Sequence, residues 1–231
     1  TLSGEKPDRT PVAFWHHFPV DDQDPQTLTR ATIAFQNQFD FDLVKITPPS
    51  SFCLKDWGVK DEWCGNSEGT RKYTQRAVQR PEDWEKLPVL DPHKGFLNEQ
   101  LTCLGGIQKE LLEDTPYIQT IFNPLSQVKN LVGPENLFMH LRRYPGALHH
   151  GLRTIQETTL RFIEAAKKYE ISGIFFAVQH ATYDLLTEKE YTEFGRAYDL
   201  PILESVDDLW LNMAHLHGDN IMFDLAADYP V

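Results

Sequence analysis

The sequence predicts an α/β fold, a (β/α)8 barrel of the TIM type. Short strand-like runs alternate with longer helical patterns along the chain, which is typical of a mainly parallel sheet. No linker rich in Gly and Ser interrupts the 231 residues, so we expect a single domain over 1–231. Five strands are recognisable, whereas a complete barrel needs about 250 residues or more. We therefore expect the chain to hold roughly the first two thirds of its barrel.

The N-terminal part is predicted to begin with a strand, a helix and a second strand. The first strand covers 11–15 (PVAFW). The helix covers 25–38, because Asp24 is a suitable N-cap and Pro25 occupies the first helical position, where proline is favoured. The second strand covers 41–46 and stops before a Thr-Pro-Pro sequence.

A polar stretch over 57–79 comes next, and its alternating KYTQRAV segment indicates an antiparallel hairpin inserted after the second strand. Beyond it, helical and strand patterns alternate. The predicted helices cover 95–114, 145–170 and a segment from about Glu188, and the predicted strands cover 116–122, 172–178 and 209–218. Thr187 and Glu190 have the spacing of a capping box at the start of the last helix.

Composition excludes several classes of function. Lys and Arg number 22 against 34 Asp and Glu, a formal net charge of −12, which opposes binding to nucleic acid and to anionic membranes. No apolar run approaches the roughly 20 residues of a membrane-spanning helix, and the N-terminus lacks the apolar segment of a secretory signal. Three scattered cysteines do not make a disulfide framework. We expect a cytoplasmic protein.

Polar side chains gather where the predicted strands end, which is where barrel enzymes hold their sites. Five of the nine histidines lie at these positions. The candidates are His16, His17, Lys45, Thr47, Asn123, Gln127, Gln179, His180, Tyr183, His215, His217, Asp219 and Asn220. The predicted catalytic residues are His16, Lys45, Gln179 and His180, and the predicted substrate-binding residues are His17, Asn123 and Tyr183.

His215 and His217 form the sharpest local motif. Residues i and i+2 of an extended segment point to one side, so both imidazoles can face one metal ion. Zinc suits two neutral imidazoles together with a thiolate or carboxylate, although the sequence identifies no third ligand. The alternative is that one histidine hydrogen-bonds a substrate carboxylate or a backbone group while the other packs.

His16, His17 and Lys45 each leave two interpretations open. The two histidines directly follow the predicted strand 11–15. Adjacent residues of an extended chain point to opposite faces, so at most one of them enters the barrel mouth, and the other packs against Phe14 and Phe18. Lys45 interrupts an apolar strand and is either an inward functional cation or an end-of-strand residue whose ammonium reaches solvent.

Six segments together resemble the uroporphyrinogen decarboxylase superfamily, in the family's order and over essentially the whole chain. They are GEKPDRTPVAFW, FDLVKITP, PYIQTIFNPLSQVKNLVG, SGIFFAVQHA, YTEFGRAYDLPIL and NMAHLHGDNIMFDL. The superfamily includes decarboxylases and cobamide-dependent methyltransferases, which move methyl groups from methylcobalamin to a thiol. The resemblance implies a (β/α)8 barrel, a small-molecule or tetrapyrrole substrate and, as in the decarboxylases, a homodimer.

The decarboxylase motifs are replaced in this chain. Decarboxylases carry an arginine-rich R-Q-A-G-R segment that grips the substrate's carboxylates, where this chain has HHFP from His16 onward. Their catalytic aspartate is replaced near Thr47, and their serine after the fourth strand is replaced by Gln179, next to a matching His180. The resemblance therefore argues against decarboxylation of uroporphyrinogen itself.

The methyltransferase branch has an H-x-C-G segment whose His and Cys bind zinc together with a later Cys. His215 matches that His, and His217 stands in the place of the Cys. The resemblance implies a zinc-dependent transfer of a methyl group from a corrinoid, free or on a corrinoid protein, to a thiol. Two alternatives stay open: a metal-free carboxy-lyase that uses His16, Lys45 and His180, and a binding barrel without catalysis.

Overall fold

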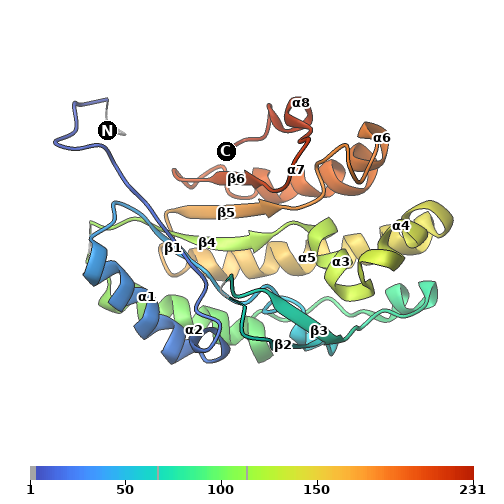
Figure 1. The fold of residues 1–231 in the computed structure, drawn as a ribbon, viewed down its shortest axis with the longest axis horizontal. Helices are drawn as coiled ribbons and strands as arrows, with labels where there is room; N and C mark the ends of the chain where they lie inside the picture. The colour runs from blue at the N-terminus through green and yellow to red at the C-terminus, as the bar shows by residue number, and fades with distance from the viewer. Residues whose placement is uncertain (1–3, 67, 113) are drawn as a thin grey trace.

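The computed structural model describes residues 4–66, 68–112 and 114–231, and its central feature is a parallel sheet of four strands in the order β1-β4-β5-β6. The strands are β1 (Val44–Ile46), β4 (Tyr117–Phe122), β5 (Gly173–Val178) and β6 (Met213–Leu216). Each connection between neighbouring strands contains helix (Figure 1). The arrangement is that of a partial TIM-type barrel, which confirms the predicted fold class.

The long helices cover one face of this sheet. They are α1 (Pro25–Phe39), α2 (Gly95–Glu110) and α5 (Pro145–Lys167), and they lie together on one side of it (Figure 1). The main hydrophobic core includes the fully buried Phe176. A small second cluster of Ile118, Phe175 and Ala177 occupies the opposite face, which we call the inner face. Neighbouring residues of a strand point to opposite faces, so β5 contributes to both clusters.

Shorter elements complete the chain. The predicted hairpin is confirmed as β2 (Lys60–Trp63) paired antiparallel with β3 (Arg71–Gln75). The remaining helical elements are α3 (Pro124–Val132), α4 (Pro134–Arg143), α6 (Glu188–Tyr191), a π-helical turn (Thr192–Arg196), α7 (Ala197–Glu204) and α8 (Phe223–Ala226). Turns of 3-10 helix cover Asp21–Gln23, Lys55–Trp57 and Pro81–Lys86.

Two predicted helix starts are confirmed by their caps. The Asp24 carboxylate accepts the N–H groups of Gln26 at 2.9 Å and Thr27 at 3.0 Å. The Thr187 hydroxyl accepts the N–H of Glu190 at 3.2 Å, and the Glu190 carboxylate accepts the N–H of Thr187 at 2.9 Å. Both caps satisfy N–H groups that have no partner inside the helix.

The predicted first strand, 11–15, is wrong. Pro11 has no N–H, and the N–H of Val12 donates to the Asp42 carboxylate at 2.7 Å instead of to a carbonyl group, so no ladder of backbone hydrogen bonds forms. The N–H of Asp42 donates to the Val12 carbonyl oxygen at 2.9 Å and ties the segment to the sheet's edge. The segment then crosses in front of the sheet (Figure 1).

Other boundaries also differ from the prediction. Strand β1 begins at Val44, and α2 ends at Glu110, four residues before the predicted end at 114. Helices α3 and α4 are additional elements that the sequence patterns do not predict. In the part of the chain that the structure describes, we find no helix with the length and apolar character needed to cross a membrane.

Candidate active site

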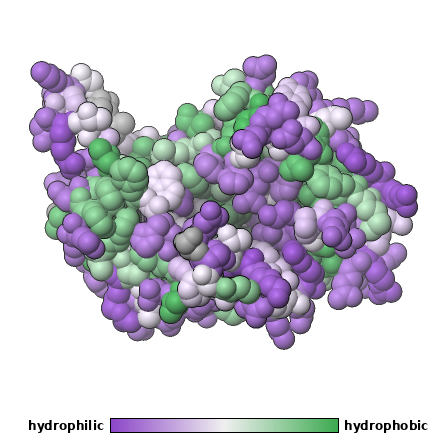
Figure 2. Space-filling view, in the orientation of Figure 1, coloured by the Kyte–Doolittle hydropathy of each residue, from purple (hydrophilic) through white to green (hydrophobic). Residues whose placement is uncertain are grey.

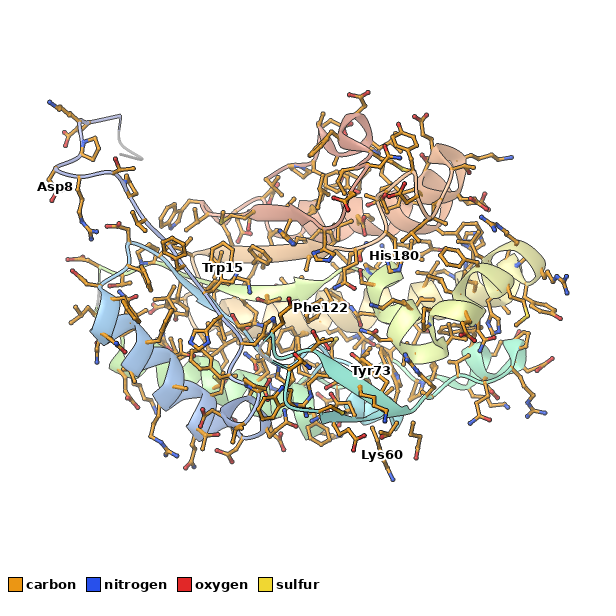
Figure 3. The ribbon with its side chains drawn as sticks, viewed as in Figure 1. Asp8, Trp15, Lys60, Tyr73, Phe122 and His180 are labelled. Carbon is orange, nitrogen blue, oxygen red and sulfur yellow. The ribbon has the colours of Figure 1, made fainter. Side chains whose placement is uncertain are left out.

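Lys45 is a buried cation on the inner face of the sheet. Its Nζ lies 4.6 Å from the centre of the Phe175 ring and 5.4 Å from that of Trp15, and it donates to the Thr47 hydroxyl at 3.2 Å. Figure 3 shows Trp15 lying beside the sheet at this place. Among the described residues Lys45 forms no ion pair. Burial lowers the pKa of its ammonium to about 8, so the charge is held by aromatic faces and one hydroxyl.

His215 and His217 lie on the same inner face, as the alternation of a strand requires. The His215 ring stacks on Phe175 with 5.3 Å between ring centres, and the His215 and His217 ring centres are 5.7 Å apart. Burial lowers the pKa of His215, and the nearby His217 and Lys45 lower it further. His215 is therefore neutral at pH 7, which is the form that binds a metal ion.

The geometry partly fits a zinc site. Two imidazoles with nitrogens about 2.0–2.1 Å from one zinc at tetrahedral angles have ring centres about 5 Å apart, close to the 5.7 Å between His215 and His217. Within the described ranges no group of three or more His, Cys, Asp or Glu side chains is placed to hold a metal. The two histidines thus supply donors of a suitable type without a third protein ligand.

His16 and His17 have different surroundings. The His16 ring packs against Phe18 and Phe35, with ring centres 4.1 and 4.6 Å away. Burial lowers the pKa of His17, and the charge of Lys45 lowers it further. This segment is not a strand, yet the two histidines still diverge, and the structure brings His17 near Lys45.

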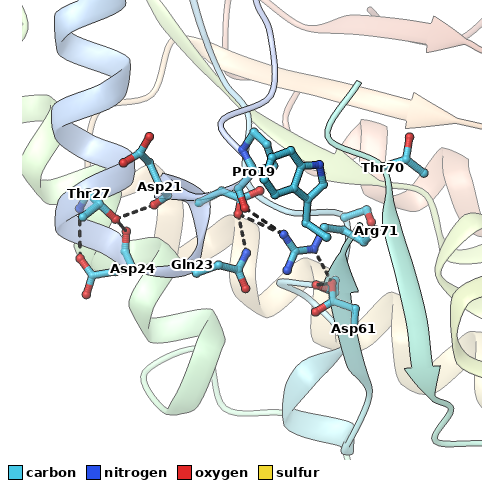
Figure 4. Close-up of polar contacts among 12 residues, drawn as sticks. Pro19, Asp21, Gln23, Asp24, Thr27, Asp61, Thr70 and Arg71 are labelled. Atoms are coloured by element: carbon cyan, nitrogen blue, oxygen red, sulfur yellow. Dashed lines mark hydrogen bonds and ion pairs between the residues drawn. The ribbon is translucent and has the colours of Figure 1, made fainter. Parts of the chain in front are cut away.

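The loop that carries His17 is fastened to the hairpin by Arg71 (Figure 4). Arg71 donates from Nη1 to the Pro19 carbonyl oxygen at 3.1 Å and from Nε to the Asp61 carboxylate at 3.1 Å. Its Nη1 also lies 3.6 Å from a carboxylate oxygen of Asp22. All three charged side chains are almost fully buried, so breaking this network leaves an uncompensated charge.

Gly69 in the hairpin loop gives a test of how tightly His17 is held. Gly69 has φ +69°, and a Cβ there would lie 2.4 Å from the Cβ of His17. We expect Gly69→Ala to lower the free energy of unfolding by about 2–4 kcal/mol, from backbone strain and from this contact. Gly65→Ala is the control, because Gly65 has φ +83° and open space around it. Equal losses in urea unfolding of the two variants would show that the loop does not press on His17.

A second polar group lies at the ends of β3, α3 and β5. Lys129 Nζ donates to the Gln179 side-chain oxygen at 3.0 Å, and Arg76 Nη1 donates to the carbonyl oxygens of Lys129 and Asn130 at 3.2 and 2.7 Å. His180 is only 3% exposed. Gln179 and His180 are site residues that the sequence predicts. Arg76 and Lys129 are not among the predicted site residues, because nothing in the sequence around them except their charge points to a site.

Asn123 and Tyr183 have structural contacts of their own. Asn123 is fully buried; its amide oxygen caps α3 by accepting the N–H of Ser126 at 3.0 Å, and its amide nitrogen donates to Asp199 at 3.0 Å. Tyr183 is exposed and donates to Glu188 at 2.5 Å. In this structure Asn123 joins β4 to α3 and fixes the start of that helix, and Tyr183 lies on the surface.

A hollow of about 980 Å³ lies at the other end of the sheet, where Tyr117, Ser172 and Leu211 precede or begin the strands. In barrel enzymes the chemistry is at the C-terminal ends of the strands. We therefore place the candidate active site on the inner face and at the strand ends, with Lys45, His17, His215 and His217 as its first group.

Comparison with known proteins identifies the family of this chain. A solved structure, a methyltransferase from Methanosarcina mazei, is similar with a TM-score of 0.83 at 17% identity, covering 99% of this chain and 71% of that chain. At this identity the likeness shows the fold alone. No curated protein sequence matches the chain. A protein-family model described as uroporphyrinogen decarboxylase (URO-D) matches residues 1–230. Because this match spans nearly every residue, the chain belongs to the uroporphyrinogen decarboxylase family.

Proposed function

We propose that this protein is a methyltransferase that moves a methyl group from a corrinoid to a thiol, with His215 and His217 as two ligands of a zinc ion. The observation that carries the proposal is the pair of imidazoles on the inner face, 5.7 Å between ring centres. The likeness of the fold to that of the Methanosarcina methyltransferase is consistent with the proposal. Bound zinc would supply a Lewis acid that lowers the pKa of the acceptor thiol.

The chain's own residues would prepare the site for this chemistry. Trp15 and Phe175 flank Lys45 and exclude water on one side, and the Lys45 ammonium can hold an anionic part of the acceptor. Zinc sites in enzymes have three protein ligands and an open position. With two histidines, the proposal needs a further ligand from another segment, or water or substrate at two positions.

Metal content tests the proposal directly. We expect near-stoichiometric zinc in the protein purified without a metal-binding tag, and loss of that zinc and of methyl transfer from methylcobalamin to a thiol in the His215→Ala, His217→Ala variant. The control removes two exposed histidines, His93 and His150, and should keep both properties. Methyl transfer that persists unchanged in the His215→Ala, His217→Ala variant would refute the proposal.

A carboxy-lyase acting on a carboxylated, porphyrin-type substrate is the second candidate. It is favoured by three cations, Lys45, Arg76 and Lys129, which form no ion pairs within the described residues. Such cations bind carboxylates. This function requires no metal, so CO2 release that survives both chelation and the His215→Ala, His217→Ala change would support it over methyl transfer.

A further inference from the structure

Arg76 has unused hydrogen-bonding capacity. Its guanidinium lies 4.7 Å from the centre of the Tyr73 ring, and its Nη1 is bonded to the two carbonyl oxygens at the end of α3. In the part of the chain that the structure describes, Nε and Nη2 make no hydrogen bond, although Arg76 is only half exposed. A guanidinium that lies over an aromatic ring and keeps N–H groups free can bind an oxyanion in a fixed direction.

Lys129 brings a second cation to the same place. It is half-buried, and its Nζ donates to Gln179 at 3.0 Å. Burial lowers the pKa of Lys129, and the charge of Arg76 lowers it further. The fold thus keeps two neighbouring cations together without a carboxylate between them, an arrangement that a bound anion would stabilise.

His180 adds a buried polar atom without a partner. The residue is 3% exposed, and its Nδ1 has no hydrogen-bond partner among the described residues. Burial, followed by the charge of Lys129, lowers its pKa to about 3, so the ring is neutral at pH 7 and carries one N–H. Buried polar atoms are normally hydrogen-bonded, which points to a ligand or a water molecule beside this ring.

We infer that Arg76, Lys129 and His180 form a subsite for the oxyanion group, carboxylate or phosphate, of a small molecule. Figure 3 places Tyr73 and His180 on either side of the C-terminal end of β4, near Phe122. Figure 2 shows hydrophilic residues around a hollow near the centre of this face. The inference goes beyond the proposed function, because an anionic group of the substrate or donor can bind here in either reaction.

A small molecule fits this subsite better than a polyanion. Arg76 and Lys129 are half-buried, so only a small group can contact both of them. The net charge of −12 repels extended anionic surfaces. On the inner face of β5, Ala177 lies between this subsite and Phe175, and it presents only a methyl group there.

Titration with inorganic phosphate and with succinate, followed by the imidazole NMR signals of His180, tests the inference. We expect saturable shifts of the His180 signal, and at least tenfold weaker binding in Lys129→Met and in Arg76→Gln. Phosphate binding without succinate binding would identify a phosphate subsite, and the reverse would identify a carboxylate subsite. Lys129→Met loses only the bond to Gln179, so it keeps the test valid if Arg76→Gln unfolds.

Two controls separate this subsite from the rest of the molecule. The double variant Arg143→Met, Lys168→Met removes one arginine and one lysine that are exposed and lie outside the subsite. It should leave the binding of phosphate and succinate unchanged. His215→Ala, His217→Ala should also leave it unchanged, while Lys129→Met should keep the metal content of the wild type. No saturable shift in the wild type, or equal affinity in wild type and Lys129→Met, would overturn the inference.

Discussion

Replacing Asp199 by alanine is expected to lower the free energy of unfolding by about 3–5 kcal/mol, because buried hydrogen-bond donors lose their acceptor. Asp199 is fully buried and accepts hydrogen bonds from the Asn123 amide at 3.0 Å and from the hydroxyls of Tyr191 and Tyr229 at 2.7 and 2.9 Å. Alanine would remove the carboxylate that accepts from these three buried donors. Each donor left without an acceptor costs about 1–3 kcal/mol. Urea unfolding followed by circular dichroism measures the loss.

Asp199→Asn is the matched variant, because it keeps the shape and removes the charge. Burial raises the pKa of Asp199 to about 6, although its three hydrogen bonds oppose this. Since an unfolded aspartate has a pKa of about 3.9, the folded state binds the proton more tightly. This tighter proton binding stabilises the folded state fully below about pH 4. The stabilisation is lost as the pH rises through about 6.

The unfolding free energies of wild type and Asp199→Asn should therefore diverge in acid. The difference should move in favour of the wild type by up to about 3 kcal/mol between pH 7 and pH 4. Carboxylates with lowered pKa values, such as Glu190 and Asp228, make the free energy of unfolding fall in acid. Both proteins contain them, so they do not change the difference between the two. A constant difference across this range would show that Asp199 is not buried as the structure has it.

The predictable parts of the fold are those with strong local signals. Strand β5 is an apolar run, β4 is a mostly apolar run between two prolines, and α1 has a capping aspartate followed by proline. The β-forming residues at 11–15 predict a first strand, but pairing also needs free N–H groups, and Pro11 and the Asp42 side chain remove them. Whether such a run joins a sheet depends on contacts far along the chain.

Helices α3 and α4 show a different limit. Pro124 and Pro134 begin the two helices, where proline is favoured, yet prolines ten residues apart with Gly133 between them also fit a loop. The choice in favour of helix comes from packing, since Leu125, Leu131 and Leu137 are fully buried. A pattern read along the sequence does not contain that information.

Some residues of the candidate site are predictable from the sequence, and others are not. The alternation of an extended segment is enough to predict that His215 and His217 share one face, and Lys45 stands out by its place in an apolar strand. The choice between His16 and His17 depends on the aromatic contacts of His16. Arg76 and Lys129 lie far apart in the sequence, and only the tertiary fold brings their charges together.

Lys45→Met should make the protein more stable and less active. A lysine pKa that falls from its ordinary 10.5 to about 8 corresponds to about 3 kcal/mol of unfavourable charge burial. At pH 7 the wild type bears this cost, so methionine should raise the free energy of unfolding by about 1–3 kcal/mol, less the lost contacts with Trp15 and Phe175. In the wild type the cost is relieved as the pH rises from about 8 to about 10.5, and this rise should be absent in the variant.

Activity should move in the opposite direction. If Lys45 holds an anionic group of the substrate, Lys45→Met should lower kcat/KM for the reaction about tenfold to a hundredfold. In the wild type kcat/KM should fall as the pH rises through about 8, the pKa of Lys45, whereas Lys45→Arg should keep its charge and lose that fall. The neighbouring titratable groups, His17 and His215, have lowered pKa values and are neutral throughout this range.

The combination of the two effects is what distinguishes function from structure at this position. A lysine that served only to fill the inner face would lower stability when replaced and leave the pH profile unchanged. A buried cation without an ion-pair partner is retained at a cost in stability when it binds something that the folded chain does not itself supply. Loss of stability in Lys45→Met together with unchanged kcat/KM would therefore assign Lys45 to packing and leave His215 and His217 as the core of the site.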